Sequence, residues 1–314
     1  MGRLVVRAVV FEPETVARAE VAAPPRGLEA WLGPAPTGGG VSVALEALRP
    51  RRLGLLVQRL PGEAVEQLWW PLLRVEEDTG RLLCRYHEGP RGEPWRHRYC
   101  SRAAATRDGY CLAHRRSAKA LYERCAQGVD EACREADRLL RGEEYTIYAL
   151  DYGGARVKVG LTQSWRLLWR IAEQPHVSAA AVASASSLVE ARGVEKRLGR
   201  LRGATEGSAA RLEDRARAAA RMLEGYSPEA AARRLASLIA GLGLRGRYRG
   251  YTVLPHGGPP GWAAAAGRPG GLPPGAWRLL DYWGGLLLFE NEAGARVVVA
   301  KRSLLHRVLV AEAE

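Results

Sequence analysis

The sequence predicts an α+β protein, and three observations lead to that fold class. Runs rich in β-branched residues, separated by Gly and Pro breaks, fill residues 1 to about 83 and are typical of short strands. From Glu144 the pattern changes to strand, turn, strand and helix, and residues 188–242 are helical in pattern. Near the end, residues 279–302 read as two strands around the turn Asn291-Glu-Ala-Gly294.

The length of 314 residues indicates about two domains, since about 150 residues per domain is common. With 47% hydrophobic residues the chain can bury a sizeable core. We divide it into five stretches: a β-rich N-terminal region (1–83), a Cys/His cluster (84–116), a helical connector (117–142), a small mixed α/β module (143–204), and a helical segment with a C-terminal β hairpin (205–314).

Local signals place the first helices. One is expected over residues 117–126, and a second begins with Asp130 as its N-cap and ends near Arg141. Ser227, followed by proline and an acid, is a strong helix start. The Gly/Pro-rich stretches 34–40 and 257–275 are predicted to be loops, the second a mobile linker.

The formal net charge is +13, and arginine supplies nearly all of the basic residues. Because the guanidinium group pairs with phosphate in a bidentate way and stacks on bases, this surplus favours a polyanionic partner. Enrichment in Arg, Ala and Gly with a single asparagine, Asn291, also fits a thermophile, in which case the charge would reflect the proteome instead.

No apolar run reaches the 18–20 residues or so of a membrane span, and the N-terminal stretch turns acidic too soon for a signal peptide. We therefore expect a cytoplasmic protein without membrane contact. In that compartment cysteines indicate metal ligation or free thiols before disulfides.

Cys84, Cys100, Cys111 and His114 form the clearest chemical signal. Cys111 and His114 are three positions apart, so one tight turn can direct both side chains to one ion. Three thiolates and one imidazole fill the tetrahedron that Zn²⁺ prefers, which predicts a structural zinc knuckle. His87 is an alternative ligand, and His97 is a further candidate.

Cys125 and Cys133 lack zinc spacing and are expected on helices. We interpret them as small core residues, with a disulfide between them as the alternative.

Two groups of residues are candidates for contact with nucleic acid. The first flanks the cysteines and comprises Arg98, Arg102, Arg115 and Arg116. The second interleaves arginine with tyrosine, as single-strand-binding surfaces do, and comprises Arg245, Arg247, Tyr248 and Arg249. A half-buried strand with tyrosine inside and arginine outside would give the same pattern.

Residues 145–200 carry a family resemblance. Thr146-Ile147-Tyr148 and Lys158-Val159-Gly160 resemble the two strand motifs that name the GIY-YIG nucleases. Residues 158–174 are similar to an uncharacterised family catalogued as domain of unknown function 2797, in which a Cys/His cluster precedes a GIY-YIG-like core and a β-rich tail follows. That order resembles this chain from about Cys84 onward.

The resemblance implies a site in which Tyr148 orients or deprotonates water, Arg170 steadies a phosphate and Glu195 holds a divalent ion such as Mg²⁺. Arg166 competes with Arg170 for its role. The chain departs from the motif at Thr146, where the family has glycine, and at Lys158, where it has a second tyrosine.

We therefore expect a zinc-binding, nucleic-acid-binding protein with a degenerate GIY-YIG-like fold, associated with RNA or the ribosome before DNA. The alternative is an active, metal-dependent nuclease of DNA or RNA.

Overall fold

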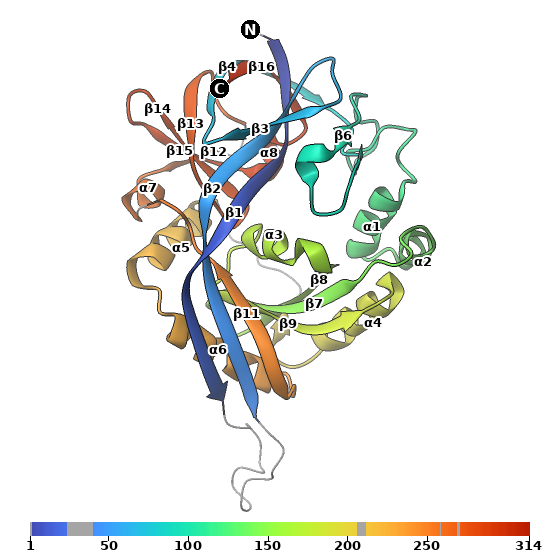
Figure 1. Cartoon of the computed structure of the whole chain (residues 1–314), viewed down its shortest axis with the longest axis vertical. Coiled ribbons are helices and arrows are strands. Elements are labelled where there is room, and N and C mark those ends of the chain that lie inside the picture. Colours follow the sequence, from blue (N-terminus) through green and yellow to red (C-terminus); the bar gives the residue numbers. More distant parts are fainter. Residues whose placement is uncertain (1, 24–39, 206–211, 258, 269–270) are drawn as a thin grey trace, which may run out of the picture.

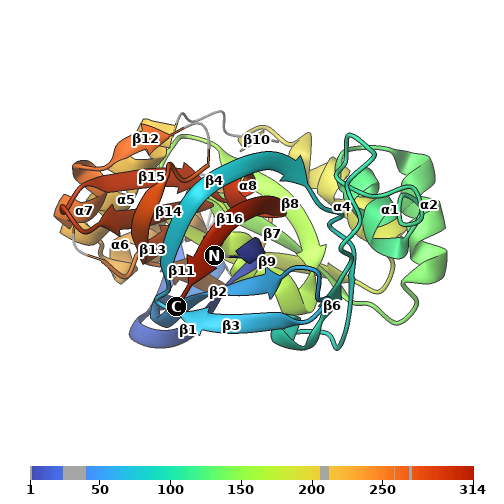
Figure 2. The ribbon, with the colours of Figure 1, turned by 90° about the horizontal axis from the view of Figure 1, so that it is seen from above.

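The computed structural model describes residues 2–23, 40–205, 212–257, 259–268 and 271–314 (Figure 1). Most strands in these ranges belong to one continuous, curved sheet, with the order β10-β8-β7-β9-β11-β2-β1-β16-β4-β13-β14-β15-β12 and β3 paired to β2. Seen from above, β4 arches over the neighbouring strand β16 (Figure 2). Helices pack against this sheet, so the protein is mixed α/β with a dominant β component, which confirms the predicted class in its coarse form.

Two long strands connect the two halves of the molecule. β1 (Gly2–Ala23) and β2 (Val41–Arg59) pair antiparallel along nearly their whole length and run from the top to the bottom of Figure 1. The prediction of short β elements is wrong here. Pro13 faces Pro50 beside a register shift, and because a bulge tolerates a residue without an N–H, these prolines do not end the strands.

The other strands of the large sheet are β3 (Val65–Trp69), β4 (Leu72–Leu82), β7 (Tyr145–Asp151), β8 (Val157–Gln163), β9 (Ser178–Ala185), β10 (Ala204–Thr205), β11 (Gly246–Val253), β12 (Ala266–Arg268), β13 (Gly275–Trp283), β14 (Leu286–Asn291), β15 (Arg296–Ala300) and β16 (Arg307–Ala313). A separate hairpin consists of β5 (His87–Glu88) and β6 (Arg98–Tyr99). The predicted terminal hairpin is confirmed as β14 and β15. Whether the C-terminal strands join the N-terminal ones was open in the sequence, and β16 does so by pairing with β1 and β4.

The helical segments are η2 (Pro94–Arg96), α1 (Ala118–Ala126), α2 (Asp130–Leu139), η3 (Ser164–Arg166), α3 (Leu167–Ala172), α4 (Leu188–Gly199), α5 (Leu212–Gly225), α6 (Pro228–Gly241), α7 (Pro259–Ala263) and α8 (Lys301–Leu304). Ser227 caps α6 through its side chain, as predicted, by accepting from the Ala230 N–H. The predicted N-cap at Asp130 is wrong by one position: Val129 is the N-cap, and Asp130 lies in the first turn, where an acid favours the helix dipole.

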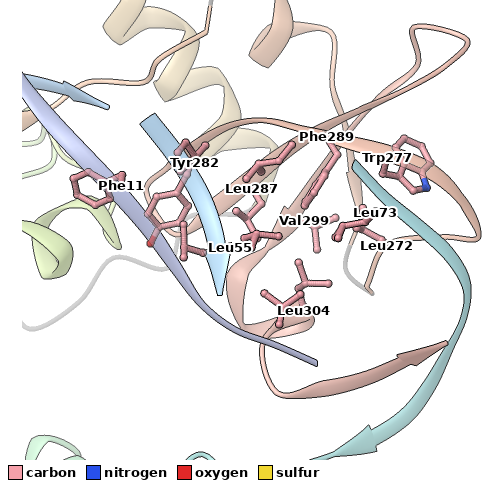
Figure 3. Packing of buried hydrophobic residues seen from close by; sticks show 14 of the residues in the cluster. Phe11, Leu55, Leu73, Leu272, Trp277, Tyr282, Leu287, Phe289, Val299 and Leu304 are labelled. Carbon is pink, nitrogen blue, oxygen red and sulfur yellow. The ribbon is translucent and has the colours of Figure 1, made fainter. Parts of the chain in front are cut away.

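Two buried clusters lie on different parts of the sheet. One gathers side chains from β1, β2 and the C-terminal strands, including Phe11, Leu55, Tyr282 and Phe289 (Figure 3). The other lies where α6 covers β2 and the β7–β8–β9 strands, and it includes Leu235. Because β1 and β2 contribute side chains to both clusters, the large sheet connects the stretches into which the sequence was divided.

The stretch 257–275, predicted to be a linker, contains α7 and β12 in its described part. Trp262 is fully buried there, and its Nε1 donates to Asp281 Oδ2 at 2.7 Å. The prediction of a mobile linker is therefore wrong for these residues, because one large aromatic side chain anchors the segment to the core. Apart from Gly40, the loop predicted at 34–40 lies outside the described residues. None of the described helices is long and apolar enough to cross a membrane.

Candidate functional site

The structure brings Cys84, Cys100, Cys111 and His114 together. Their ligand atoms all lie within 4.8 Å of one another. His114 Nδ1 is 3.6 Å from the Cys84 sulfur and 3.4 Å from the Cys111 sulfur. The four residues chosen from the sequence thus form one candidate metal centre.

Short backbone contacts hold this centre in place. The Cys84 N–H donates to the Arg102 carbonyl at 2.8 Å, and the Cys100 N–H donates to the Tyr86 carbonyl at 3.0 Å. Gly109, with φ of 81°, makes the turn before Cys111. We call residues 83–116 the Cys/His lobe.

His87, the alternative ligand, is not part of the group. Its ring stacks on that of His97 at 4.5 Å between centroids and lies 5.0 Å from the ring of Tyr99. In contrast, the His114 ring stacks on Tyr86 at 3.9 Å, which leaves Nδ1 directed at the sulfurs.

Three sulfurs and one imidazole nitrogen suit Zn²⁺, which favours thiolate and imidazole donors in a tetrahedron. Two ligands are buried and two are half-buried. With four protein ligands no position remains for substrate, so the centre can stabilise the fold and is not arranged for catalysis.

Arg7 connects this centre to the large sheet. It lies at a register shift of β1 between Val6 and Ala8, where a bulge redirects a side chain. The buried guanidinium donates to the Cys84 carbonyl at 3.0 Å and to the Cys100 carbonyl at 2.7 Å. Its remaining partners are Gln58 Oε1 at 2.6 Å and His306 Nδ1 at 3.1 Å. Arg7 therefore fixes the backbone of two ligands from outside the lobe.

Replacing Arg7 by methionine is expected to weaken zinc affinity by about 10- to 100-fold, the usual effect of losing an outer-shell partner. Methionine keeps an apolar stem in the space but leaves the carbonyls of Cys84 and Cys100 without their donor. Competition with a chromogenic chelator measures the affinity. An unchanged zinc affinity would show that the lobe holds its geometry without Arg7, and Arg3→Met, a change at an exposed position of β1, is the control.

Cys125 and Cys133 form a disulfide that joins α1 to α2. The preferred interpretation as unpaired core thiols is wrong, although both residues are buried, and the alternative of a disulfide is correct. The turn at Gly128, with φ of 100°, brings the two helices close enough for the sulfurs to meet. The spacing of the two cysteines in the sequence did not by itself indicate that the helices turn back on each other here.

The arginines of the Cys/His lobe point outward. The side chains of Arg98, Arg102 and Arg115 are exposed and make no hydrogen bond or ion pair with any described residue. Arg116 pairs with Glu135 at 2.9 Å but is 74% exposed. At Arg98, Arg102 and Arg115 the lobe thus presents cations that no carboxylate of the described residues neutralises.

The second arginine-rich group lies on β11. Arg247 and Arg249 are exposed and pair with Glu20 and Glu46 across the sheet, while Tyr248 packs against the buried cluster beneath α6. Tyr248 also donates from its hydroxyl to the Arg245 carbonyl at 2.7 Å. This arrangement agrees with the interpretation of a half-buried strand. Arg18, Glu46 and their neighbours line a hollow of about 490 Å³ beside these arginines.

Tyr148 is fully buried in β7. It lies opposite Gly160 of β8, where a Cβ atom would come within 2.5 Å of the tyrosine hydroxyl, so the ring needs glycine at that position. The hydroxyl accepts a hydrogen bond from Gln174 Nε2 at 2.9 Å.

Electrostatic interactions connect Arg170 with Tyr148, and Lys158 with Arg170 and Glu195. Burial would lower the pKa of Arg170, but Tyr148 and Glu173 outweigh it and raise that pKa. Burial and Arg170 lower the pKa of Lys158, against the opposing effect of Glu195. Tyr148, Lys158 and Arg170 therefore share one electrostatic environment, which Glu195 borders.

Glu195 itself forms an ion pair with Arg192, one turn earlier on α4. No group of metal-binding side chains that includes Glu195 is found among the described residues. The expectation of Mg²⁺ at Glu195 gains no support from this geometry.

Three residues were not identified from the sequence: Arg7 beside the candidate metal centre, and Glu173 and Lys301 beside Arg170. Glu173 receives Arg166, Arg170 and Lys301 as ion-pair partners. Its spacing of three from Arg170, at the end of the same helix, was a readable signal, whereas Arg7 on β1 and Lys301 on α8 are distant in the sequence.

Comparison of the chain with protein-family models, with curated proteins and with solved structures finds no match. The likeness to the GIY-YIG nucleases and to domain of unknown function 2797 accordingly remains a proposal, and function has to be inferred from the geometry.

Proposed function

We propose that this protein binds nucleic acid, RNA or the ribosome before DNA, through a zinc-stabilised Cys/His lobe, on a degenerate GIY-YIG-like fold. The observation that carries the proposal is the combination, in one lobe, of a Cys₃His centre with exposed arginines that have no partner among the described residues. A rigid metal-held surface with unpaired guanidinium groups suits contact with phosphates.

Exposed apolar side chains in the same lobe also support the proposal. Leu112 lies between two ligands and is 66% exposed, and Trp95 is 42% exposed next to Arg96. Exposed aromatic and aliphatic side chains beside arginine can stack on unpaired bases, which favours single-stranded regions.

Salt dependence tests the proposal. Binding of labelled single-stranded RNA and DNA should weaken steeply as salt rises, and replacing Arg98, Arg102 and Arg115 together by alanine should reduce the slope of log affinity against log salt by about 2. The matched control replaces three exposed arginines that already have carboxylate partners, Arg51, Arg59 and Arg74, and removes the same charge. An equal loss in both triple variants would point to net charge alone and contradict a binding lobe.

The alternative is an active nuclease that uses Tyr148, Arg170 and Glu195, with Lys158 or Arg166 as auxiliary cations. It is supported by the shared electrostatic environment of Tyr148, Lys158 and Arg170. Against it stand the burial of the tyrosine and the ion pair of Glu195 with Arg192. Mg²⁺-dependent cleavage that disappears in Glu195→Ala would establish the enzyme, and cleavage by Glu195→Ala at the wild-type rate would dismiss this site.

A further inference from the structure

Three cationic side chains converge on one carboxylate, outside the Cys/His lobe. Glu173 Oε1 lies 2.5 Å from Lys301 Nζ and 3.5 Å from Arg166 Nη2, and Glu173 Oε2 lies 3.2 Å from Arg170 Nη1. We call these four residues the Glu173 cluster. One negative charge faces three positive ones, so the cluster carries an excess of two positive charges.

The excess charge is accessible to solvent. The Glu173 side chain is only 15% exposed, whereas those of Arg166, Arg170 and Lys301 are 33%, 41% and 23% exposed. The acid thus lies beneath and its partners lie nearer the surface. Each guanidinium has five N–H donors, and a single carboxylate cannot satisfy them all.

Different parts of the chain build the cluster. Arg166 and Arg170 come from η3 and α3, which follow the β7–β8 hairpin. Lys301 is the first residue of α8, which lies between β15 and β16 in the sequence. α8 and α3 lie near each other at the middle of the molecule (Figure 1).

The positive field extends beyond the cluster toward the Cys/His lobe. Burial, with Arg166 and Arg85 acting in the same direction and Glu123 opposing them, lowers the pKa of Lys119 on α1 to about 7. Burial also lowers the pKa of Lys301, against the opposing effect of Glu173, and Arg166 and Arg170 act in the same direction as burial. Like charges that depress one another in this way are relieved by a bound anion.

We propose that the Glu173 cluster is a phosphate-binding site, in which Arg166, Arg170 and Lys301 hold one phosphoryl group and Glu173 is a built-in counter-ion that partly neutralises them. The physiological ligand follows from the proposed function, on which this identification rests: a phosphate of a nucleic-acid strand that also contacts the Cys/His lobe. Guanidinium and ammonium donors on separate elements match the several oxygens of such a group.

Calorimetric titration of the full-length, zinc-loaded protein tests the site with three probes: inorganic phosphate, a single-stranded oligonucleotide with a 5′-phosphate, and the same strand without it. Lys301→Met and Arg166→Met should each weaken phosphate binding by about 10-fold or more, the usual effect of losing a charge-assisted hydrogen bond. Methionine keeps the aliphatic stem packed. Arg302→Met, at the exposed neighbouring position of α8, should bind as wild type.

Glu173→Gln separates a ligand site from an internal ion-pair network. Removing the counter-ion raises the local charge excess from two to three, so phosphate affinity should increase by about threefold or more. Weaker binding in this folded variant, or wild-type affinity in both methionine variants, would overturn the proposal. A preference for the 5′-phosphorylated strand identifies a terminal phosphate, and equal binding of both strands identifies the phosphodiester backbone.

The two proposals fail separately. If the lobe arginines prove irrelevant but inorganic phosphate still binds through Lys301 and Arg166, the phosphate site stands without the proposed function. If phosphate does not bind while the lobe variants reduce the slope of log affinity against log salt, the proposed function stands without the phosphate site.

Discussion

Removal of the metal is expected to unfold the Cys/His lobe, because the apolar cluster buried there is small. It consists of Cys84, Tyr110 and Cys111 of the lobe with Ala120 of α1, so two of its four members are ligands themselves. Structural zinc in small modules contributes about 10–16 kcal/mol of apparent binding free energy at neutral pH. No apolar cluster of this size could replace that contribution.

Hydrogen exchange with zinc present and after chelation measures this effect. Amides of Cys84, Cys100 and His114, which are hydrogen-bonded in the folded lobe, should lose protection, while amides of β7 should keep theirs. Cys111→Ser should reproduce the chelated state. A variant lacking the disulfide, with serine at positions 125 and 133, should retain one zinc per chain. Protection of the lobe that persists without metal would contradict a structural role for the ion.

Asp281→Ala is expected to be among the most destabilising single changes in the molecule, by about 3–6 kcal/mol. The fully buried carboxylate accepts four hydrogen bonds, from the backbone N–H groups of His256, Gly257 and Tyr282 and from Trp262 Nε1, at 2.7–2.9 Å. Alanine leaves all four donors buried without an acceptor, and each unsatisfied donor costs about 1–3 kcal/mol before relaxation.

Two further variants apportion that loss. Asp281→Asn keeps one oxygen but turns an amide NH₂ toward two other donors, so it should lose roughly half as much stability as the alanine variant. Trp262→Phe removes a single donor and should cost about 1 kcal/mol. Urea unfolding followed by tryptophan fluorescence and circular dichroism gives the free energies. If Asp281→Ala stays within about 1 kcal/mol of wild type, the carboxylate is not what anchors the 257–275 segment.

The metal centre was predictable because its chemistry is local and its residue types are rare. Cys111 and His114 occupy one turn, and few other combinations of cysteine and histidine were available in the chain. Arg7 was not predictable, since it reaches carbonyls 77 and 93 positions away in the sequence. An arginine that donates to distant backbone carbonyls leaves no sequence pattern, either around the arginine or around the residues whose carbonyls accept.

The fold was predictable where elements carry strong local signals, such as the cap at Ser227 and the terminal turn at Asn291. It was not predictable at β9, an alanine-rich run with weak strand propensity that nevertheless pairs with β7 and β11. Small side chains suit that position, because it is buried in a sheet covered by helices. The resemblance located Tyr148 and Arg170 near each other but did not indicate the burial of the tyrosine.

The position of β16 between β1 and β4 has a consequence for how the protein is made. β1 and β4 leave the ribosome long before β16 is translated, so the strand edges that pair with β16 remain unpaired during synthesis. Such long-range pairing is slow and exposes nascent chains to aggregation. His306, just before β16, contacts Arg7 at 3.1 Å only after that strand docks, and Arg7 in turn donates to the carbonyls of Cys84 and Cys100. We therefore expect a stalled nascent chain that lacks β16 to bind zinc more weakly than the full chain.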